Sequence, residues 1–177
     1  MAHDAATATG QPLSPTRAVL YGTLVVGVLD GLDAIIFFGL RGASPVRIFQ
    51  GIASGLLGRE AVNGGLPVAA LGVLLHFFIA FLIVGTYFLA SRKIGVLTRR
   101  PIICGALYGV LAYLVMNLVV LPLSATGGGG IPSMVGLING VLIHVIGVGI
   151  PSALFARAAR GEDREELRPI REIRQAS

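Results

Sequence analysis

Four ionisable side chains lie inside stretches that are otherwise apolar: Asp30, Asp33, His76 and His144. Near the centre of a bilayer such a group costs at least ~2.5–3.5 kcal/mol, so it usually faces protein or water and marks a candidate functional site. Carboxylates and imidazoles in one place could relay protons, because histidine ordinarily titrates close to neutral pH. They could also bind a metal ion through nitrogen and oxygen ligands, or two histidines could ligate a haem axially.

A purely structural hypothesis stands beside these three. In it, the Asp and His side chains pair across helices and only fix helix packing, at an average of ~0.6 kcal/mol per intramembrane hydrogen bond. The sequence has no His-x-x-x-His, Glu-x-x-His or Ser-His-Asp pattern and no cysteine cluster. The glycine run at 127–130 lacks the Lys-Ser/Thr of a phosphate-binding loop. We therefore assign no catalytic residue, expect no enzyme activity and no nucleotide, and leave the cofactor open.

The elements that carry these groups follow from composition. The chain of 177 residues is 54% hydrophobic and 13% charged, with a mean hydropathy of +0.82, whereas soluble domains are about 25% charged. Apolar stretches at 19–40, 66–90, 102–121 and 133–155 are each long enough to cross a ~30 Å hydrocarbon core as a helix. They lack the strict alternation of barrel strands. The sequence predicts an all-α, four-helix bundle in the lipid bilayer, formed by residues 18–156.

Charge sets the predicted orientation. Positive residues precede the first span at Arg17, fill the second connection at 92–100 and recur in the tail at 157–177, whereas the third connection is uncharged. By the positive-inside rule, both termini are cytoplasmic and the protein lies in the inner (plasma) membrane. Residues 1–17, without a basic signal-peptide region, are predicted to be a disordered cytoplasmic leader, and 157–177 a charged cytoplasmic tail. Because the basic residues flank apolar spans, we expect no nucleic-acid partner; a homo- or hetero-oligomer stays open.

The first connection contains a further predicted helix, at 45–57. Ser44 followed by Pro45 is a favourable helix start. Apolar residues then recur at helical spacing, at Val46, Phe49, Ile52, Ala53, Leu56 and Leu57, with Arg47, Gln50 and Ser54 mainly on the opposite side. This pattern is typical of an amphipathic interfacial helix. The segment either lies on the membrane surface or re-enters the membrane part way.

Depth and helix faces predict that the ionisable groups meet. Counted from the span ends, all four fall near mid-depth, shifted slightly outward, and stripes of small residues mark the faces that pack against other helices. We therefore predict one metal or proton-relay cluster of Asp30, Asp33, His76 and His144, supported by Tyr87, Tyr113 and Asn117. Asn139 falls on the side of its helix away from His144 and is left out of this cluster.

From His76 onward, several features recur in one known family. They are His76 and Tyr87 in the second span, the basic connection followed by Gly105 and Gly109, Pro122 at the end of the third span, and His144. In these features the chain resembles the YagU-like family of bacterial inner-membrane proteins. The resemblance implies a small multi-pass protein without an assigned activity and adds weight to His76 and His144. It offers no counterpart for Asp30 and Asp33.

Overall fold

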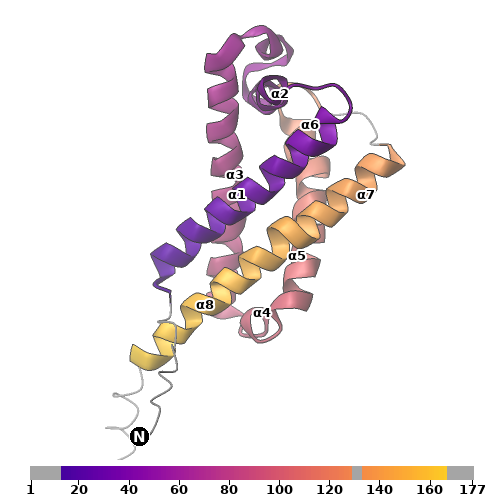
Figure 1. Cartoon of the computed structure of the whole chain (residues 1–177). Helices are drawn as coiled ribbons and strands as arrows, with labels where there is room; N and C mark the ends of the chain where they lie inside the picture. Colours follow the sequence, from indigo (N-terminus) through magenta and orange to yellow (C-terminus); the bar gives the residue numbers. More distant parts are fainter. Residues whose placement is uncertain (1–12, 129–132, 167–177) are drawn as a thin grey trace, which may run out of the picture.

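The computed structural model describes residues 13–128 and 133–166, with side chains as far as 160. Within these ranges the chain forms helices and no strand, which confirms the predicted all-α class (Figure 1). Four helices are long and apolar enough to cross a membrane, by length and composition: Pro15–Gly39, Gly65–Lys93, Pro101–Leu123 and Met134–Arg160.

Two of the four long helices are uninterrupted, and two contain a π-helical segment. The first is α1 (Pro15–Gly39) and the second is α3 (Gly65–Lys93). The third consists of α5 (Pro101–Val115), the π segment η2 (Met116–Val120) and α6 (Leu121–Leu123). The fourth consists of α7 (Met134–Ile143), the π segment η3 (His144–Gly149) and α8 (Ile150–Glu166). The connections contain α2 (Pro45–Leu57), the 3₁₀ helix η1 (Arg59–Asn63) and α4 (Val96–Arg99).

The helices form a bundle with two distinct ends. Figure 1 shows α1 and the α7–η3–α8 helix running side by side in front of α3 and α5. Helix α2 and α6 lie at one end of the bundle, and α4 lies at the other, where α1 begins and α8 ends. Helix α8 packs against α1, α3 and α5, so it is the common partner of the other three long helices.

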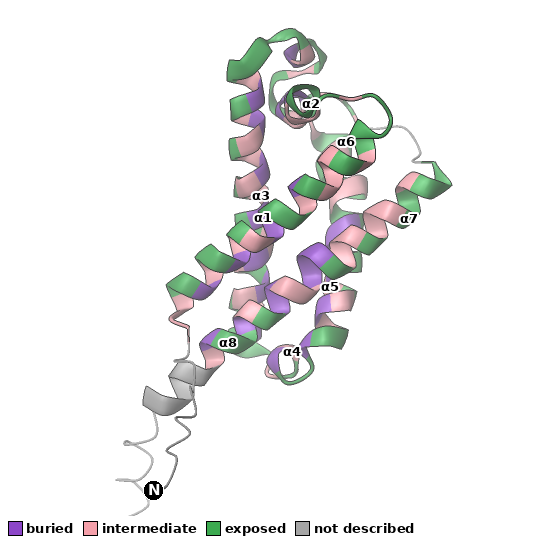
Figure 2. Ribbon diagram, in the orientation of Figure 1, coloured by how far each residue is buried: buried purple, intermediate pink, exposed green. Residues whose placement is uncertain are grey.

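The outward faces of the long helices are apolar. Leu74, Leu107 and Ile146 are each more than 60% exposed, and exposed positions recur along every long helix (Figure 2). Only 22% of each candidate span is buried inside the bundle. Such an extended apolar surface is unfavourable in water and is favourable in lipid. The surface therefore indicates a multi-pass membrane protein.

Serine side chains begin three of the helices. Ser14 accepts a hydrogen bond from the backbone N–H of Arg17 at 3.4 Å, Ser44 from that of Arg47 at 3.3 Å, and Ser133 from that of Gly136 at 3.1 Å. Each bond satisfies a donor that the first helical turn leaves free. The predicted helix at 45–57 is confirmed with these bounds.

Two predicted boundaries are shifted by the structure. Helix α1 begins at Pro15, so residues 15–17 of the predicted leader are helical. Helix α8 continues to Glu166 without a break at residue 157, with Ala159 only 1% exposed and Arg160 Nη1 donating to the Gly95 carbonyl at 3.3 Å. The start of the predicted tail is therefore packed on the bundle. The remaining parts of the predicted leader and tail, 1–12 and 167–177, lie outside the described residues.

Helix α2 buries two of its three polar residues against the protein, together with Ala53, whereas its third polar residue, Arg47, is exposed. Gln50 and Ser54 are 5% and 6% exposed, whereas Leu56 and Leu57 are 61% and 53% exposed. The Gln50 amide donates to the Gly65 carbonyl at 2.9 Å, and Ser54 donates to Gly51 at 2.6 Å. The hydrogen bonds offset the cost of burying these polar groups. The outward-facing leucines thus cover the side of α2 that faces away from the bundle.

Both π segments directly precede a proline inside a long helix. Pro122 follows η2 and Pro151 follows η3. Proline lacks the N–H of the helical ladder and its ring clashes with the carbonyl four residues earlier, so the backbone must adjust on that side. A π turn is one such adjustment and is frequently found at functional sites. The Ser152 hydroxyl donates to the Val148 carbonyl at 2.7 Å and satisfies a backbone acceptor next to this irregularity.

Glycines allow α5 and η3 to touch backbone to backbone. A Cβ added at Gly109 would collide with the His144 carbonyl and come within 2.7 Å of Val145 Cα. A Cβ at Gly105 would lie 2.8 Å from the Gly149 carbonyl oxygen. Because no side chain separates the helices here, the start of η3 is held against α5. Close approach through small residues is the common way that helices associate in lipid.

This contact predicts a stability difference between two glycine substitutions. Gly109→Ala should lower the free energy of unfolding by about 1–3 kcal/mol, because the new methyl group meets backbone that cannot move aside. Gly85→Ala is the matched control: it is also a helical glycine, and a Cβ there meets nothing within 4 Å. Denaturation of the purified variants in mixed detergent micelles measures both values, and equal stabilities would contradict the close contact.

Candidate functional site

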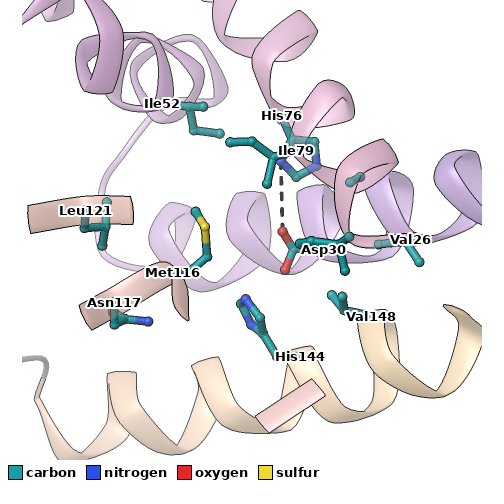
Figure 3. Close-up of a pocket in the computed structure, with 12 residues that line it drawn as sticks. Val26, Asp30, Ile52, His76, Ile79, Met116, Asn117, Leu121, His144 and Val148 are labelled. Atoms are coloured by element: carbon teal, nitrogen blue, oxygen red, sulfur yellow. Dashed lines mark ion pairs between the residues drawn. The ribbon is translucent and has the colours of Figure 1, made fainter. Parts of the chain in front are cut away.

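A cavity of about 220 Å³ lies between the long helices, on the α2 side of their middle. Its polar lining comes from four of the predicted site residues: Asp30 on α1, His76 on α3, Asn117 on η2 and His144 on η3. Figure 3 shows the Asp30 carboxylate between the two imidazole rings. The tertiary structure thus brings both histidines and one aspartate to a single space.

His76 is held by a backbone carbonyl. Its Nε2 lies 2.8 Å from the Gly27 carbonyl oxygen, and the side chain is 10% exposed. Because a carbonyl only accepts hydrogen bonds, Nε2 carries the hydrogen. Phe77 contacts the ring edge-on at a centroid distance of 5.5 Å. At Gly31 a Cβ would come within 3.3 Å of Nε2, so small residues on α1 make room for the ring.

The other nitrogen of His76 faces Asp30. Nδ1 lies 4.0 Å from Asp30 Oδ2, and the Asp30 side chain is 30% exposed (Figure 3). This distance is longer than a direct N–H···O bond of ~2.7–3.2 Å. In the neutral ring, Nδ1 has a lone pair, so two hydrogen-bond acceptors face each other. A proton on either group, or a donor placed between them, makes the interaction attractive.

His144 faces the same cavity with Nε2 unbonded, whereas the unbonded nitrogen of His76 is Nδ1. Its Nδ1 lies 2.9 Å from the Gly140 carbonyl, so Nδ1 carries the hydrogen and Nε2 is the free acceptor of the neutral ring. Tyr113 packs edge-on against the ring at 5.4 Å, and a Cβ at Gly140 would lie 2.5 Å from the Tyr113 ring. Helix packing therefore fixes the orientation of this imidazole.

Asn117 contributes a further acceptor. Its amide nitrogen donates to the Tyr113 carbonyl at 2.9 Å, one turn earlier on the same helix. Within the described part of the chain its Oδ1 has no hydrogen-bond partner. The cavity lining therefore contains a carboxylate, two ring nitrogens and an amide oxygen as acceptors, together with the second N–H of the Asn117 amide as a donor.

Asp33 does not line this cavity. Its Oδ2 accepts a hydrogen bond of 2.8 Å from the amide of Asn139 on α7. The three-residue spacing placed Asp30 and Asp33 on one side of α1, but the two carboxylates meet different helices. Asn139 is not among the residues that line the cavity, and its helix face alone does not predict that its partner is Asp33.

The two predicted supporting tyrosines have different surroundings. Tyr113 touches His144, as described above. Tyr87 is 1% exposed and lies towards the α4 end, where its hydroxyl donates to the Leu97 carbonyl at 2.9 Å. Its ring packs edge-on against Tyr108 at 5.0 Å. Tyr87 therefore joins α3 to the α4 region and does not reach the cavity.

A metal centre receives no geometric support. Among residues 13–128 and 133–160, no group of three or more His, Cys, Asp or Glu side chains is close enough together to hold a metal ion.

Comparison with known proteins provides no assignment. No protein-family model, curated protein or solved structure matches this chain. The resemblance to the YagU-like family therefore has no support beyond the residues on which it rests.

The hydrogen-bond pattern predicts the tautomer of each cavity histidine. In the His3→Gln variant, which leaves two histidines, neutral His76 should carry its proton on Nε2 and neutral His144 on Nδ1. Nitrogen-15 NMR of histidine-labelled protein in nanodiscs, assigned with His76→Gln and His144→Gln, distinguishes the tautomers. Finding the same tautomer at both positions would contradict the arrangement.

The Asp33–Asn139 bond predicts an energetic coupling between α1 and α7. A double-mutant cycle with Asp33→Ala and Asn139→Ala should give about 0.6 kcal/mol, the average for intramembrane hydrogen bonds. The same cycle with Asp30→Ala and Asn139→Ala is the control and should give a coupling close to zero. Denaturation in mixed micelles measures both, and a larger coupling in the control would contradict the pairing.

Proposed function

We propose that this chain is a multi-pass inner-membrane protein that takes up and releases a proton at the cavity formed by Asp30, His76 and His144. The observation that carries the proposal is the contact of His76 Nδ1 with Asp30 Oδ2 at 4.0 Å, with Nε2 already bonded to a carbonyl. A carboxylate facing a neutral imidazole through its lone pair lacks one proton, and adding that proton forms either an ion pair or a hydrogen bond.

A second acceptor makes proton exchange within the cavity feasible. His144 Nε2 is free and its ring is directed towards Asp30 (Figure 3). Asp30 thus lies between two imidazoles whose outer nitrogens are both held by carbonyls. Rigid placement keeps the three groups ready for proton transfer without rearrangement of the helices. Intramembrane Asp/His groups of this kind are common in proton relays.

Access to the cavity differs on its two sides. Towards the α4 end, Val26, Ala80, Val84 and Val148 form a buried apolar cluster that contains no proton-carrying group. Towards the α2 end, the lining residues Ile52 and Leu121 are also apolar, but they belong to the short helices α2 and α6 at that end of the structure (Figure 1). We therefore place proton entry on the α2 side, which the positive-inside rule assigns to the outside of the cell.

Several features support the membrane orientation. Positive residues are more numerous at the α4 end, at Arg17, Arg92, Lys93, Arg99 and Arg100, than in the connection at the α2 end, which has Arg41, Arg47 and Arg59 against Glu60. The exposed leucines of α2 point away from the protein, which favours immersion of this helix in the outer interface over a position on top of the bundle. Membership of the YagU-like family is a proposal that rests on the residues named above, and no enzyme activity is part of this function.

Infrared spectroscopy tests the proton site. A pH-induced difference spectrum of the full-length protein in nanodiscs should contain a carboxylic-acid or imidazole band from this site, and Asp30→Asn should remove that band. Asp33→Asn is the matched control: it lies one turn away on the same helix, and its partner Asn139 is outside the cavity. That variant should retain the band. A spectrum unchanged by Asp30→Asn would overturn the proposal.

The structural hypothesis makes a different prediction for the same variant. If Asp30 and His76 only fix helix packing, Asp30→Asn should destabilise the bundle and no pH-induced band should depend on it. A stable Asp30→Asn variant that has lost the band supports the proton site. A purely structural role fits Asp33 and Asn139 better than it fits Asp30, because these two side chains are hydrogen-bonded directly to each other.

A further inference from the structure

An apolar groove adjoins the polar cavity between α3 and α5. Its volume is about 290 Å³, and its walls include Leu82, Thr86, Leu111 and Val120. Three residues, Ile79, Ile83 and Met116, line both the groove and the cavity. The two spaces are therefore neighbours that share these three side chains in their walls, and one of the three, Met116, is unbranched and flexible enough to change rotamer.

The groove lies between α3 and α5, which both pack on α8. A side-chain hydrogen bond from Tyr108 links α5 to α3 near the α4 end of the groove. Tyr108 donates from its hydroxyl to the Ile83 carbonyl at 2.7 Å, and its ring packs against Tyr87. On the α2 side of this bridge, η2 shifts the helix before Pro122. Leu82 and Leu111 are 49% and 54% exposed, so the groove opens on the lipid-facing surface rather than towards an aqueous end.

The groove offers no side-chain hydrogen-bond donor. The hydrogens of its two hydroxyl groups are already used, since Thr86 donates to Leu82 at 2.7 Å and Tyr108 donates to Ile83. Because the other lining side chains are apolar, an occupant is held there mainly by apolar contact. The adjoining cavity is polar: Asp30, both imidazoles and the Asn117 amide oxygen are acceptors, and the second N–H of the Asn117 amide is a spare donor.

We infer that the site binds a lipid-soluble molecule with an apolar tail and a hydroxyl-bearing head, of which a tailed hydroquinone is the simplest example. The tail lies in the α3–α5 groove, and the head donates its O–H groups to the acceptors around Asp30. A carbonyl head can accept only from the Asn117 amide and meets acceptors at Asp30 and at both imidazoles, so it is disfavoured relative to a hydroxyl head. This inference rests on the proposed proton site and names the class of molecule that reaches it.

Three probes with the same decyl tail separate head recognition from simple partitioning: decyl-1,4-hydroquinone, decyl-1,4-benzoquinone and decylbenzene. Each probe is titrated into the full-length protein in nanodiscs, and the hydroquinone is kept under reducing, oxygen-free conditions. The rise in the unfolding midpoint temperature with probe concentration gives an apparent affinity. We expect the hydroquinone to bind at least about tenfold more tightly than either analogue, since an unpaired buried acceptor weakens binding. Equal affinity of the three probes would overturn the inference.

Substitutions in α5 test the groove itself. Leu111→Trp fills the groove without altering a cavity residue and should weaken hydroquinone binding at least about tenfold. Leu114→Trp is the matched control, because Leu114 is similarly exposed, at 44%, and does not line the groove. Equal loss in both variants, or no loss in either, would overturn the tail position.

Failure of this inference can be told apart from failure of the proton site. The infrared test uses protein without any added probe. If the Asp30-dependent band is present but hydroquinone shows no preference over decylbenzene, the inference is overturned and the proton site stands. If hydroquinone binds selectively while no band depends on Asp30, the ligand site is supported and the proposed function is overturned.

Discussion

The backbone contact between α5 and η3 is the constraint on which the cavity depends. Gly105, Gly109 and Gly149 let the two helices touch without intervening side chains. Without a hydrophobic driving force between helices in lipid, such close packing supplies much of their association. The contact extends along η3, from Gly109 at its first residues to Gly105 at its last, and the Gly109 part fixes the backbone of His144. A methyl group at Gly109 would displace the histidine backbone together with the helix.

Two prolines extend this constraint into the polar site. Pro122 and Pro151 each follow a π segment, and these segments carry Asn117 and His144. Irregular backbone at membrane depth is tolerated where it is buried in protein or lines a cavity. Here both irregular segments border the same cavity. The site is thus built where two helices depart from regular geometry, opposite the regular helices that carry Asp30 and His76.

Much of the site was predictable, and the reason for the remainder is physical. His76, His144 and Asp30 were identified because ionisable groups are costly in lipid, and depth counting placed them at one level. Helical spacing could not separate Asp30 from Asp33, because residues three apart share a broad face that spans two neighbouring helices. Asn139 and Tyr87 show the same limit. Their partners, Asp33 and the Leu97 carbonyl, are set by helix rotation and packing. Pro122 and Pro151 are visible in the sequence and mark where the π segments form. Which side chains the π segments bring to the cavity depends on the helices packed opposite them.

The sequence by itself determined that this chain forms apolar helices, where the helix at 45–57 begins, and which ionisable residues lie within the spans. These properties follow from local hydropathy, capping and spacing. Only the tertiary structure decided which aspartate faces the histidines, which nitrogen of each ring is free, and that the polar cavity adjoins an apolar groove. Those features depend on the orientation of side chains from different helices, and orientation is set by contacts between residues far apart in the chain.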